Sequence, residues 1–213
     1  TAPGELPSHD VHCQIQQIEA LNHDVSRVWL QLPAGKRVQW HAGQYLMLNL
    51  NGEGFPFSIA NHCDGRRLEL HIRHGDDNSA AQDIMASLKS ASTVSITLPA
   101  GLRFIDSAPE QPVWFICGST GFAPVKAMVE RLIALDFDQP VRLFWGARTP
   151  EDLYLPTLPA QWKTALKDFD FTTALSDIRH PDHAEGLVHE AALAALNEPE
   201  LPLFYLGGSP PMA

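Results

Sequence analysis

The sequence predicts a two-domain β plus α/β protein, in which an antiparallel β-barrel precedes a parallel-sheet domain. Up to about residue 102, short runs of alternating apolar residues are separated by turn residues, a pattern typical of antiparallel strands. After Pro99-Ala100-Gly101, apolar runs alternate instead with helical patterns, which is typical of βαβ units around a parallel sheet. A chain of 213 residues is long enough for two such domains.

The first domain is assigned to residues 11–104, and residues 1–10, with Pro3, Gly4 and Pro7, are interpreted as a tail or linker. Residues 79–88 show helical spacing, and Ser79 is the expected N-cap. Five alternating runs predict the strands: Val11/Cys13/Ile15, Val28/Leu30/Leu32, Leu46/Leu48/Leu50, Leu68/Leu70/Ile72 and Val94/Ile96/Leu98.

The second domain is assigned to residues 105–213, with the boundary between Ala100 and Pro112. Its continuous apolar runs suit strands that are buried on both faces of a parallel sheet. Strands are predicted at residues 113–117, 141–145, 169–175 and 203–206. Helices are predicted at residues 124–134, 161–166 and 188–196.

Charge and composition narrow the class of partner. The net charge of −10 argues against nucleic acid, whose phosphates would be repelled, and equally against an anionic membrane surface. No apolar run approaches the ~20 residues that a membrane-spanning helix needs. We therefore expect small-molecule partners, with no nucleic acid and no membrane.

The cysteines and histidines indicate neither a disulfide nor a metal site. Cys13, Cys63 and Cys117 are odd in number, form no CxxC pair and lie in or beside predicted strands. Buried free thiols, together with a start that lacks a signal-peptide pattern, favour a reducing, cytoplasmic setting. Histidine pairs such as His71 and His74 lack a matching cysteine or carboxylate cluster, so no metal is predicted.

The turn that follows residues 113–117 is a candidate nucleotide-binding turn. It lies at the carboxyl end of a predicted strand and at the amino end of a helix, where Pro124 suits the first turn. Free N–H groups and the helix dipole favour an anion there, and Gly118 and Gly121 allow close approach of the backbone. The GxGxxG spacing is absent, so packing alone is the alternative interpretation of this stretch.

Four motifs together resemble the ferredoxin–NADP reductase superfamily, particularly its bacterial NAD(P)H:flavin oxidoreductases and the reductase components of oxygenases. The resemblance extends from about Val11 to the end of the chain. The motifs are His41-Ala42-Gly43-Gln44-Tyr45-Leu46, Phe55-Pro56-Phe57-Ser58-Ile59-Ala60-Asn61, Gly118-Ser119-Thr120-Gly121-Phe122-Ala123-Pro124 and Gly207-Gly208-Ser209-Pro210-Pro211-Met212. The resemblance implies a flavin-binding barrel, an NAD(P)H-binding second domain, and hydride transfer from nicotinamide C4 to flavin N5 where the domains meet.

The resemblance also implies roles for individual residues. Ser58, within reach of flavin N5, and Thr120, facing the nicotinamide, are the candidate catalytic residues. Tyr45 and Phe57 are alternatively core residues of their strands, whereas a hydroxyl between Phe57 and Ile59 is harder to explain by packing. The implied cofactor-binding residues are Tyr45, Pro56, Phe57, Ser58, Ile59, Ser79, Gly118, Ser119, Thr120, Gly121, Pro124, Arg148, Ser176, Gly207, Gly208 and Pro210.

The sequence departs from the family pattern on the flavin side. Phe55 occupies the position of an arginine that commonly pairs with flavin phosphate, and phenylalanine cannot replace a cation. Asp76 and Asp77 precede the predicted helix where FAD enzymes of the family hold a pyrophosphate, although acidic residues also suit a helix start. These features fit either a flavin bound transiently as a substrate or a degenerate flavin site.

Departures also occur on the nicotinamide side. Gly207 replaces a cysteine that many members carry, although flavin oxidoreductases lack that cysteine too. Family members continue beyond the last motif, so we expect that both ends of the chain are trimmed. Asp177 would oppose the 2′-phosphate of NADPH, whereas Arg148 would favour it, and the balance indicates NADH.

The sequence therefore predicts an oxidoreductase that passes hydride from NADH or NADPH to FMN or FAD. The flavin is either a free substrate or a relay for electrons. One alternative is a reductase module with bound flavin that serves an iron–sulfur protein or an oxygenase. Another is a non-catalytic descendant that keeps the fold, an alternative that Phe55, Asp76 and Asp77 favour.

Overall fold

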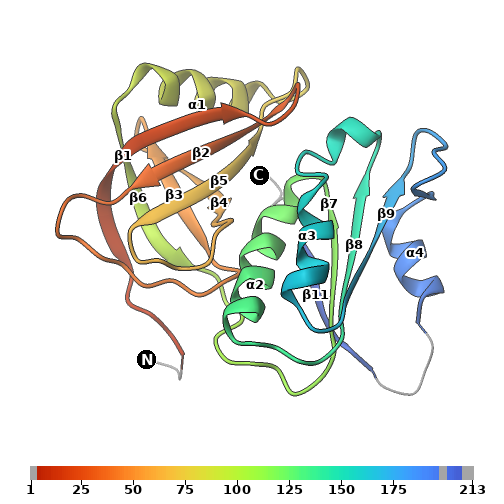
Figure 1. Cartoon of the computed structure of the whole chain (residues 1–213). Helices are drawn as coiled ribbons and strands as arrows, with labels where there is room; N and C mark the ends of the chain where they lie inside the picture. Colours follow the sequence, from red (N-terminus) through yellow and green to blue (C-terminus); the bar gives the residue numbers. More distant parts are fainter. Residues whose placement is uncertain (1–3, 197–200, 208–213) are drawn as a thin grey trace.

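The computed structural model describes residues 4–196 and 201–207, and it contains one antiparallel and one parallel sheet (Figure 1). The antiparallel sheet is curled and has the strand order β4-β3-β6-β1-β2-β5, so β4 and β5 are its edges. Its elements, in chain order, are β1 (His9–Ala20), β2 (Val25–Gln31), β3 (Tyr45–Leu50), β4 (Glu53–Ser58), β5 (Arg67–Arg73), α1 (Ser79–Ser90) and β6 (Thr93–Ala100).

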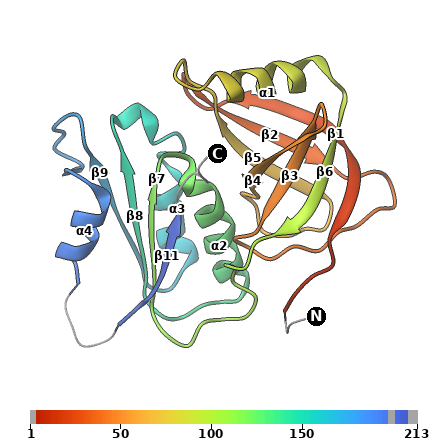
Figure 2. The ribbon, with the colours of Figure 1, turned by 180° about the vertical axis from the view of Figure 1, so that it is seen from behind.

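The second half of the chain forms a parallel sheet with the strand order β10-β9-β8-β7-β11. Helices α2 and α3 cover the face of this sheet that carries Phe115 and Trp145, and α4 packs on the opposite face. Figures 1 and 2 both show α2 between the parallel sheet and the barrel. The elements are β7 (Val113–Gly118), η1 (Ser119–Gly121), α2 (Phe122–Ala134), β8 (Val141–Ala147), η2 (Pro150–Asp152), α3 (Leu158–Ala165), β9 (Phe169–Leu175), β10 (Ala184–Glu185), α4 (Val188–Ala194) and β11 (Leu203–Gly207).

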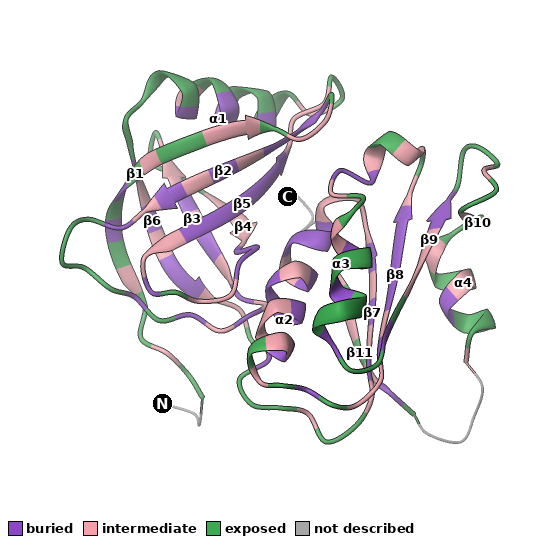
Figure 3. Ribbon diagram, viewed as in Figure 1, coloured by how far each residue is buried: buried purple, intermediate pink, exposed green. Residues whose placement is uncertain are grey.

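Alternation along the barrel strands builds the first core. In β3, Leu46 and Leu48 are fully buried while Tyr45 and Met47 are half-buried, as a strand with one face on a core requires. Strand β5 departs from this pattern because all its inner residues are buried (Figure 3). Its leucines and isoleucine join the barrel core, so its alternate residues face the second domain.

The predicted fold class is confirmed, with differences at the ends of several elements. Asn78, and not Ser79, is the N-cap of α1: its side chain accepts a hydrogen bond from the Ala81 N–H at 3.1 Å. Asn caps as well as Ser does, and the Asn78 N–H donates to the Gly75 carbonyl at 2.9 Å in the turn that precedes the helix. Helix α2 begins at Phe122, before Pro124, because η1 tightens the turn ahead of it.

Three further findings concern predictions made from the sequence. Strand β1 begins at His9, within the stretch interpreted as a tail. The three cysteines are free, and burial raises the pKa of the Cys13 thiol to about 12. No helix in the described part of the chain has the length and apolar character to cross a membrane.

Candidate functional site

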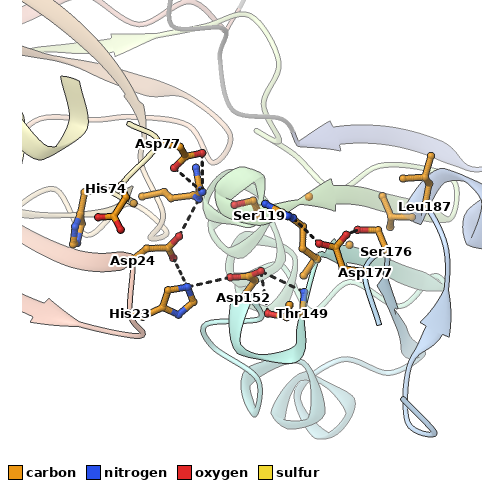
Figure 4. A pocket seen from close by; sticks show the side chains of 18 of the residues that line it. His23, Asp24, His74, Asp77, Ser119, Thr149, Asp152, Ser176, Asp177 and Leu187 are labelled. Atoms are coloured by element: carbon orange, nitrogen blue, oxygen red, sulfur yellow. Dashed lines mark hydrogen bonds and ion pairs between the residues drawn. The ribbon is translucent and has the colours of Figure 1, made fainter. Parts of the chain in front are cut away.

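A cavity of about 930 Å³ lies between the two domains, at the carboxyl ends of the parallel strands (Figure 4). Ligands of open α/β sheets bind at this edge, because helix amino ends and strand-end loops converge there. The barrel domain contributes His23, Asp24, Arg73, His74, Gly75, Asp76 and Asp77 to the lining. The second domain contributes Gly118, Ser119, Gly146, Ala147, Arg148, Thr149, Asp152, Ser176, Asp177, Gly186, Leu187 and Val188.

The predicted nucleotide-binding turn forms part of this lining. Gly118 ends β7, and Ser119 follows in the left-handed region at φ 49°, which few non-glycine residues adopt. The Trp145 indole N–H donates a hydrogen bond to the Ser119 carbonyl at 3.2 Å, and the same ring stacks on Phe122 with centroids 3.9 Å apart. A buried aromatic pair therefore holds the turn in shape at the start of α2.

Gly207, which departs from the family pattern, has no room for a side chain in this structure. A Cβ atom there would lie 2.2 Å from the Gly121 carbonyl oxygen and 3.0 Å from the Cys117 Cβ. The end of β11 thus lies directly against the turn. Gly208 and Pro210, which were also predicted to bind the cofactor, lie outside the described residues.

Two other predicted residues, Arg148 and Ser176, line the cavity and are tied to Asp177. The Arg148 guanidinium lies 2.8 Å from the Asp177 carboxylate, and the Ser176 hydroxyl donates to the same carboxylate at 2.9 Å. These two hydrogen bonds lower the pKa of Asp177, and its carboxylate in turn raises the pKa of Arg148. Arg148 is therefore already engaged with an anion of the protein itself.

The rest of the cavity is acidic. Arg73, the second lining arginine, pairs with Asp24 at 3.2 Å and with Asp77 at 3.0 Å. Asp76 and Asp152 add two further carboxylates to the lining. A phosphate group would meet few unpaired cations here, so the backbone N–H groups and the dipole of α2 are the available anion donors.

The turn between β1 and β2 reaches across the cavity mouth to η2. His23 Nε2 lies 3.8 Å from an Asp24 oxygen and 3.7 Å from an Asp152 oxygen, and the Asn22 amide donates to the Glu151 carbonyl at 2.8 Å. Within the described ranges, His23, Asp24 and Asp152 are the one group whose geometry could hold a metal ion. The His23 side chain is 62% exposed and faces both carboxylates, and the absence of a metal stays a prediction.

The predicted flavin residues divide between the two faces of the β3–β4 hairpin. Tyr45 pairs in register with Ser58, which places these half-buried residues on one face. Pro56, in register with Met47, shares that face. In the described part of the chain, the Ser58 hydroxyl has no hydrogen-bond partner, so it is available to a ligand.

The core face of the same hairpin holds the remaining members of the motif. Phe57 and Phe55 pair in register with Leu46 and Leu48, and both phenylalanines pack against the barrel core. Ile59 is fully buried in that core, so its side chain offers no surface to a ligand. Phe55 thus replaces the family arginine with a residue that completes the core.

Among the described residues, the predicted site residues other than Gly118, Ser119, Arg148 and Ser176 are not part of the cavity lining, and this includes Tyr45, Pro56 and Ser58 of the flavin motif. Ser79 is an exposed first residue of α1, two positions after Asp77. Thr120, Gly121 and Pro124 belong to η1 and the first turn of α2.

Sequence reasoning missed several residues of the lining. Gly146 pairs in register with Gly118 at the end of β8, and a Cβ there would lie 2.7 Å from the Val188 Cβ. The same strand-end argument that selected Gly118 would have found Gly146. His23, Asp24 and Arg73 come from the barrel domain, and no pattern in the sequence places them beside the parallel sheet.

A curled antiparallel sheet, a parallel sheet and an interdomain cavity with a backbone-lined turn define a two-domain nucleotide-binding protein. Two families match the chain in sequence: the oxidoreductase FAD-binding domain at residues 12–104 and the oxidoreductase NAD-binding domain at residues 115–213. The chain therefore belongs to the ferredoxin–NADP reductase family.

Individual relatives agree with this assignment. The chain is 36% identical over 159 residues to reductase component 2 of terephthalate 1,2-dioxygenase from Comamonas, covering 73% of this chain and 46% of that protein. It is 30% identical over 151 residues to an NAD(P)H-flavin reductase from Vibrio harveyi, covering 68% of this chain and 63% of that protein. The chain thus spans about half to two thirds of the length of these relatives.

The fold is shared with solved reductases. A cytochrome P450 reductase from Amycolatopsis superposes with a TM-score of 0.85 at 26% identity, over 97% of this chain and 64% of that one. A ferredoxin–NADP+ reductase from Neisseria gonorrhoeae, solved with bound FAD and NADP, superposes with a TM-score of 0.69 at 18% identity, over 97% of this chain and 87% of that one. The first domain is accordingly an FAD-binding and the second an NAD-binding oxidoreductase domain.

Proposed function

We propose that this chain is the catalytic part of a reductase that passes hydride from NADH to a flavin. The observation that carries the proposal is the shared cavity: an FAD-binding and an NAD-binding domain line one space, and the nucleotide-binding turn opens into it. Two cofactors that react by hydride transfer must meet in such a space.

The barrel domain is suited to bind the isoalloxazine ring of a flavin. Tyr45 and Pro56 present flat, half-buried surfaces beside Ser58, whose hydroxyl is without a protein partner among the described residues. Bound there, a flavin would supply the hydride-accepting ring nitrogen N5, and the Ser58 hydroxyl is the group we assign to it. Phe55, Asp76 and Asp77 offer no cation to a flavin phosphate, so we propose that the ring contributes most of the binding energy.

The second domain fits the nicotinamide nucleotide. Gly118, Ser119 and the amino end of α2 offer backbone N–H groups to a diphosphate, and we assign Thr120 to the nicotinamide side. Asp177, paired with Arg148, would meet a 2′-phosphate with a negative charge. We therefore propose NADH as the preferred donor.

A second candidate function concerns the electron acceptor. Because a 36% identical relative is the reductase component of a dioxygenase, an oxygenase or iron–sulfur protein is the partner that we propose for the complete protein. The flavin would then relay electrons singly to that partner instead of leaving as a product. The free thiols support a cytoplasmic setting for either function.

The test is oxidation of NADH and NADPH by the full-length protein, with and without added riboflavin, FMN and FAD. We expect a colourless preparation that oxidises NADH only when flavin is added. A yellow preparation that reduces a one-electron acceptor without added flavin would favour the second candidate function. Absence of NAD(P)H oxidation with every flavin and every acceptor would overturn both.

A further inference from the structure

A network of buried polar side chains joins the two domains beneath the cavity. Glu69 and His71 project from β5 of the barrel domain, and they are 0% and 5% exposed. Lys126 on α2 and Tyr154, just after η2, belong to the second domain. Four polar side chains of this kind are not needed to fill a core, since apolar residues would do so without loss of hydration.

The contacts of the network form one continuous chain across the interface. Lys126 Nζ lies 2.8 Å from Glu69 Oε1, and it also donates to the Ala60 carbonyl of the barrel domain at 3.3 Å. Glu69 Oε2 lies 2.6 Å from His71 Nε2, and His71 Nδ1 lies 2.8 Å from the Tyr154 hydroxyl oxygen. Each domain therefore supplies the partners that the other domain's buried groups require.

The protonation states follow from these partners. Burial, together with the charges of Lys126 and Arg27, lowers the pKa of His71 despite the neighbouring Glu69 carboxylate, so the imidazole is neutral. A carboxylate only accepts, so His71 Nε2 carries the hydrogen and donates it to Glu69. Burial raises the pKa of Tyr154, which stays protonated and donates to Nδ1. Each donor then has an acceptor, and Lys126 has three, in Glu69, the Ala60 carbonyl and Glu130. A shift of the second domain along β5 would break the bonds of Lys126 and Tyr154 together.

The network is connected to the cavity on both sides. Tyr154 packs edge-on against Trp145, with centroids 5.5 Å apart, and the Trp145 indole holds the Ser119 carbonyl of the nucleotide-binding turn. On the barrel side, Arg73 lies two positions beyond His71 on β5 and lines the cavity. The nucleotide-binding turn and the part of the cavity lining at Arg73 are thus connected to opposite ends of the same network.

We propose that Lys126, Glu69, His71 and Tyr154 are positioning residues, which hold the nicotinamide-binding turn in register with the flavin-binding barrel and thereby set the rate of hydride transfer. The inference rests on the proposed function. None of the four side chains lines the cavity, so they act through the alignment of the two domains. Hydride transfer is sensitive to such alignment, because misplacement of reacting groups by about 1 Å can slow a reaction about 100-fold.

The first test separates rate from binding. Tyr154→Phe removes only the hydroxyl and keeps the ring against Trp145, so it is the mildest break in the network. We expect flavin reduction at saturating NADH, followed by stopped flow, to slow about tenfold or more, while the dissociation constants for flavin and NADH change by less than about threefold. Asp168→Asn, which removes an ion pair with Arg142 inside the second domain, is the matched control and should change neither quantity.

The second test asks whether the two charged members act as one unit. Lys126→Met and Glu69→Gln should each slow flavin reduction, and the double variant should be no slower than the slower single variant. Multiplication of the two effects would overturn the proposal, as would a loss of rate explained fully by weaker binding of either cofactor. If one of these variants does not fold, the rate measured for Tyr154→Phe decides whether the proposal holds.

A third measurement keeps the outcome independent of the proposed function. If the wild-type protein reduces no flavin, the proposed function is wrong. Hydrogen exchange then tests whether the four residues hold the two domains in register. Tyr154→Phe should then speed amide exchange at the start of α2 and in β5 but not in β1 or β6. Unchanged exchange at the interface, with or without activity, would overturn the proposal.

Discussion

Two clusters of charged and polar side chains cross the domain interface, and they differ in burial. The lower cluster of Lys126, Glu69 and His71 is almost fully enclosed, with 11% of the Lys126 side chain and 1% of the Glu69 side chain exposed. The cluster at the cavity mouth, which includes His23 and Asp152, has the His23 side chain 62% exposed and its contacts longer than 3.5 Å.

The difference shows how burial decides the role of an ion pair. In the enclosed cluster, each charge depends on its partner, because a lone buried charge loses its hydration without compensation. At the cavity mouth, water screens the same kinds of group and their contacts contribute little to stability. The enclosed cluster is therefore suited to fix the arrangement of the domains, and the exposed one can rearrange when a ligand enters.

The largest expected effect follows from breaking the enclosed cluster. Lys126→Met should lower the free energy of unfolding by about 3–5 kcal/mol, because buried Glu69 loses its nearest cation and keeps only Arg27, 3.8 Å away. Asp177→Asn, which removes the exposed pair with Arg148, should leave the free energy of unfolding unchanged within error. Urea denaturation of both variants measures the two values, and equal losses would contradict the comparison.

The next effect is the pH dependence of stability that His71 contributes. The His71 ring is surrounded by Glu69, Lys126, Arg27 and Tyr154, and Glu130 lies beyond Lys126. The unfolded side chain titrates near the ordinary pKa of 6.5, whereas the folded one has a lowered pKa, so below pH 6.5 the unfolded state binds more protons.

Stability should therefore fall as the pH falls below 6.5, by at most about 1.4 kcal/mol per pH unit from this group, until the lowered folded pKa is passed. His71→Gln keeps a donor and an acceptor but cannot titrate. Its stability should fall less steeply over the same range, as measured by urea denaturation in steps of pH. Parallel curves for both proteins would show that His71 does not carry the dependence.

A smaller effect is expected at the exposed pair of Arg148 and Asp177, in the choice of nucleotide. Asp177→Asn removes the negative charge beside Ser176 and leaves Arg148 without its partner. The ratio of kcat/KM for NADPH to that for NADH should rise by about tenfold, equivalent to about 1.4 kcal/mol. An unchanged ratio would mean that the 2′-position of the nucleotide does not reach this pair.

The smallest effect concerns the flavin phosphate. Because Phe55 joins the barrel core and Asp76 and Asp77 stand near the start of α1, no cation of this region is assigned to that phosphate. Riboflavin and FMN should therefore bind with affinities within about 1 kcal/mol of each other. Titration at low and high salt measures this, and a strong preference for FMN would point to another phosphate-binding residue.

Much of the fold follows from local periodicity, which the sequence displays directly. Apolar residues at alternate positions, such as Leu46 and Leu48 or Leu68 and Leu70, predict barrel strands, because successive side chains of a strand point to opposite faces. The strand, turn and helix around Gly118 are equally local, and so are the motifs that indicate a flavin and a nicotinamide nucleotide. The family and its two domains were therefore within reach of the sequence alone.

The tertiary structure decided how those parts meet. Glu69 and His71 look like polar positions of an ordinary strand, and Lys126 and Tyr154 lie 57 and 83 residues further along the chain. Only the packing of the second domain, through α2 and the segment after η2, on β5 joins these four residues into one buried network. The residue pattern of a strand does not indicate which segment covers its second face. The division of Phe57 and Ser58 between two faces, and the lack of space at Gly207, likewise depend on packing between distant segments.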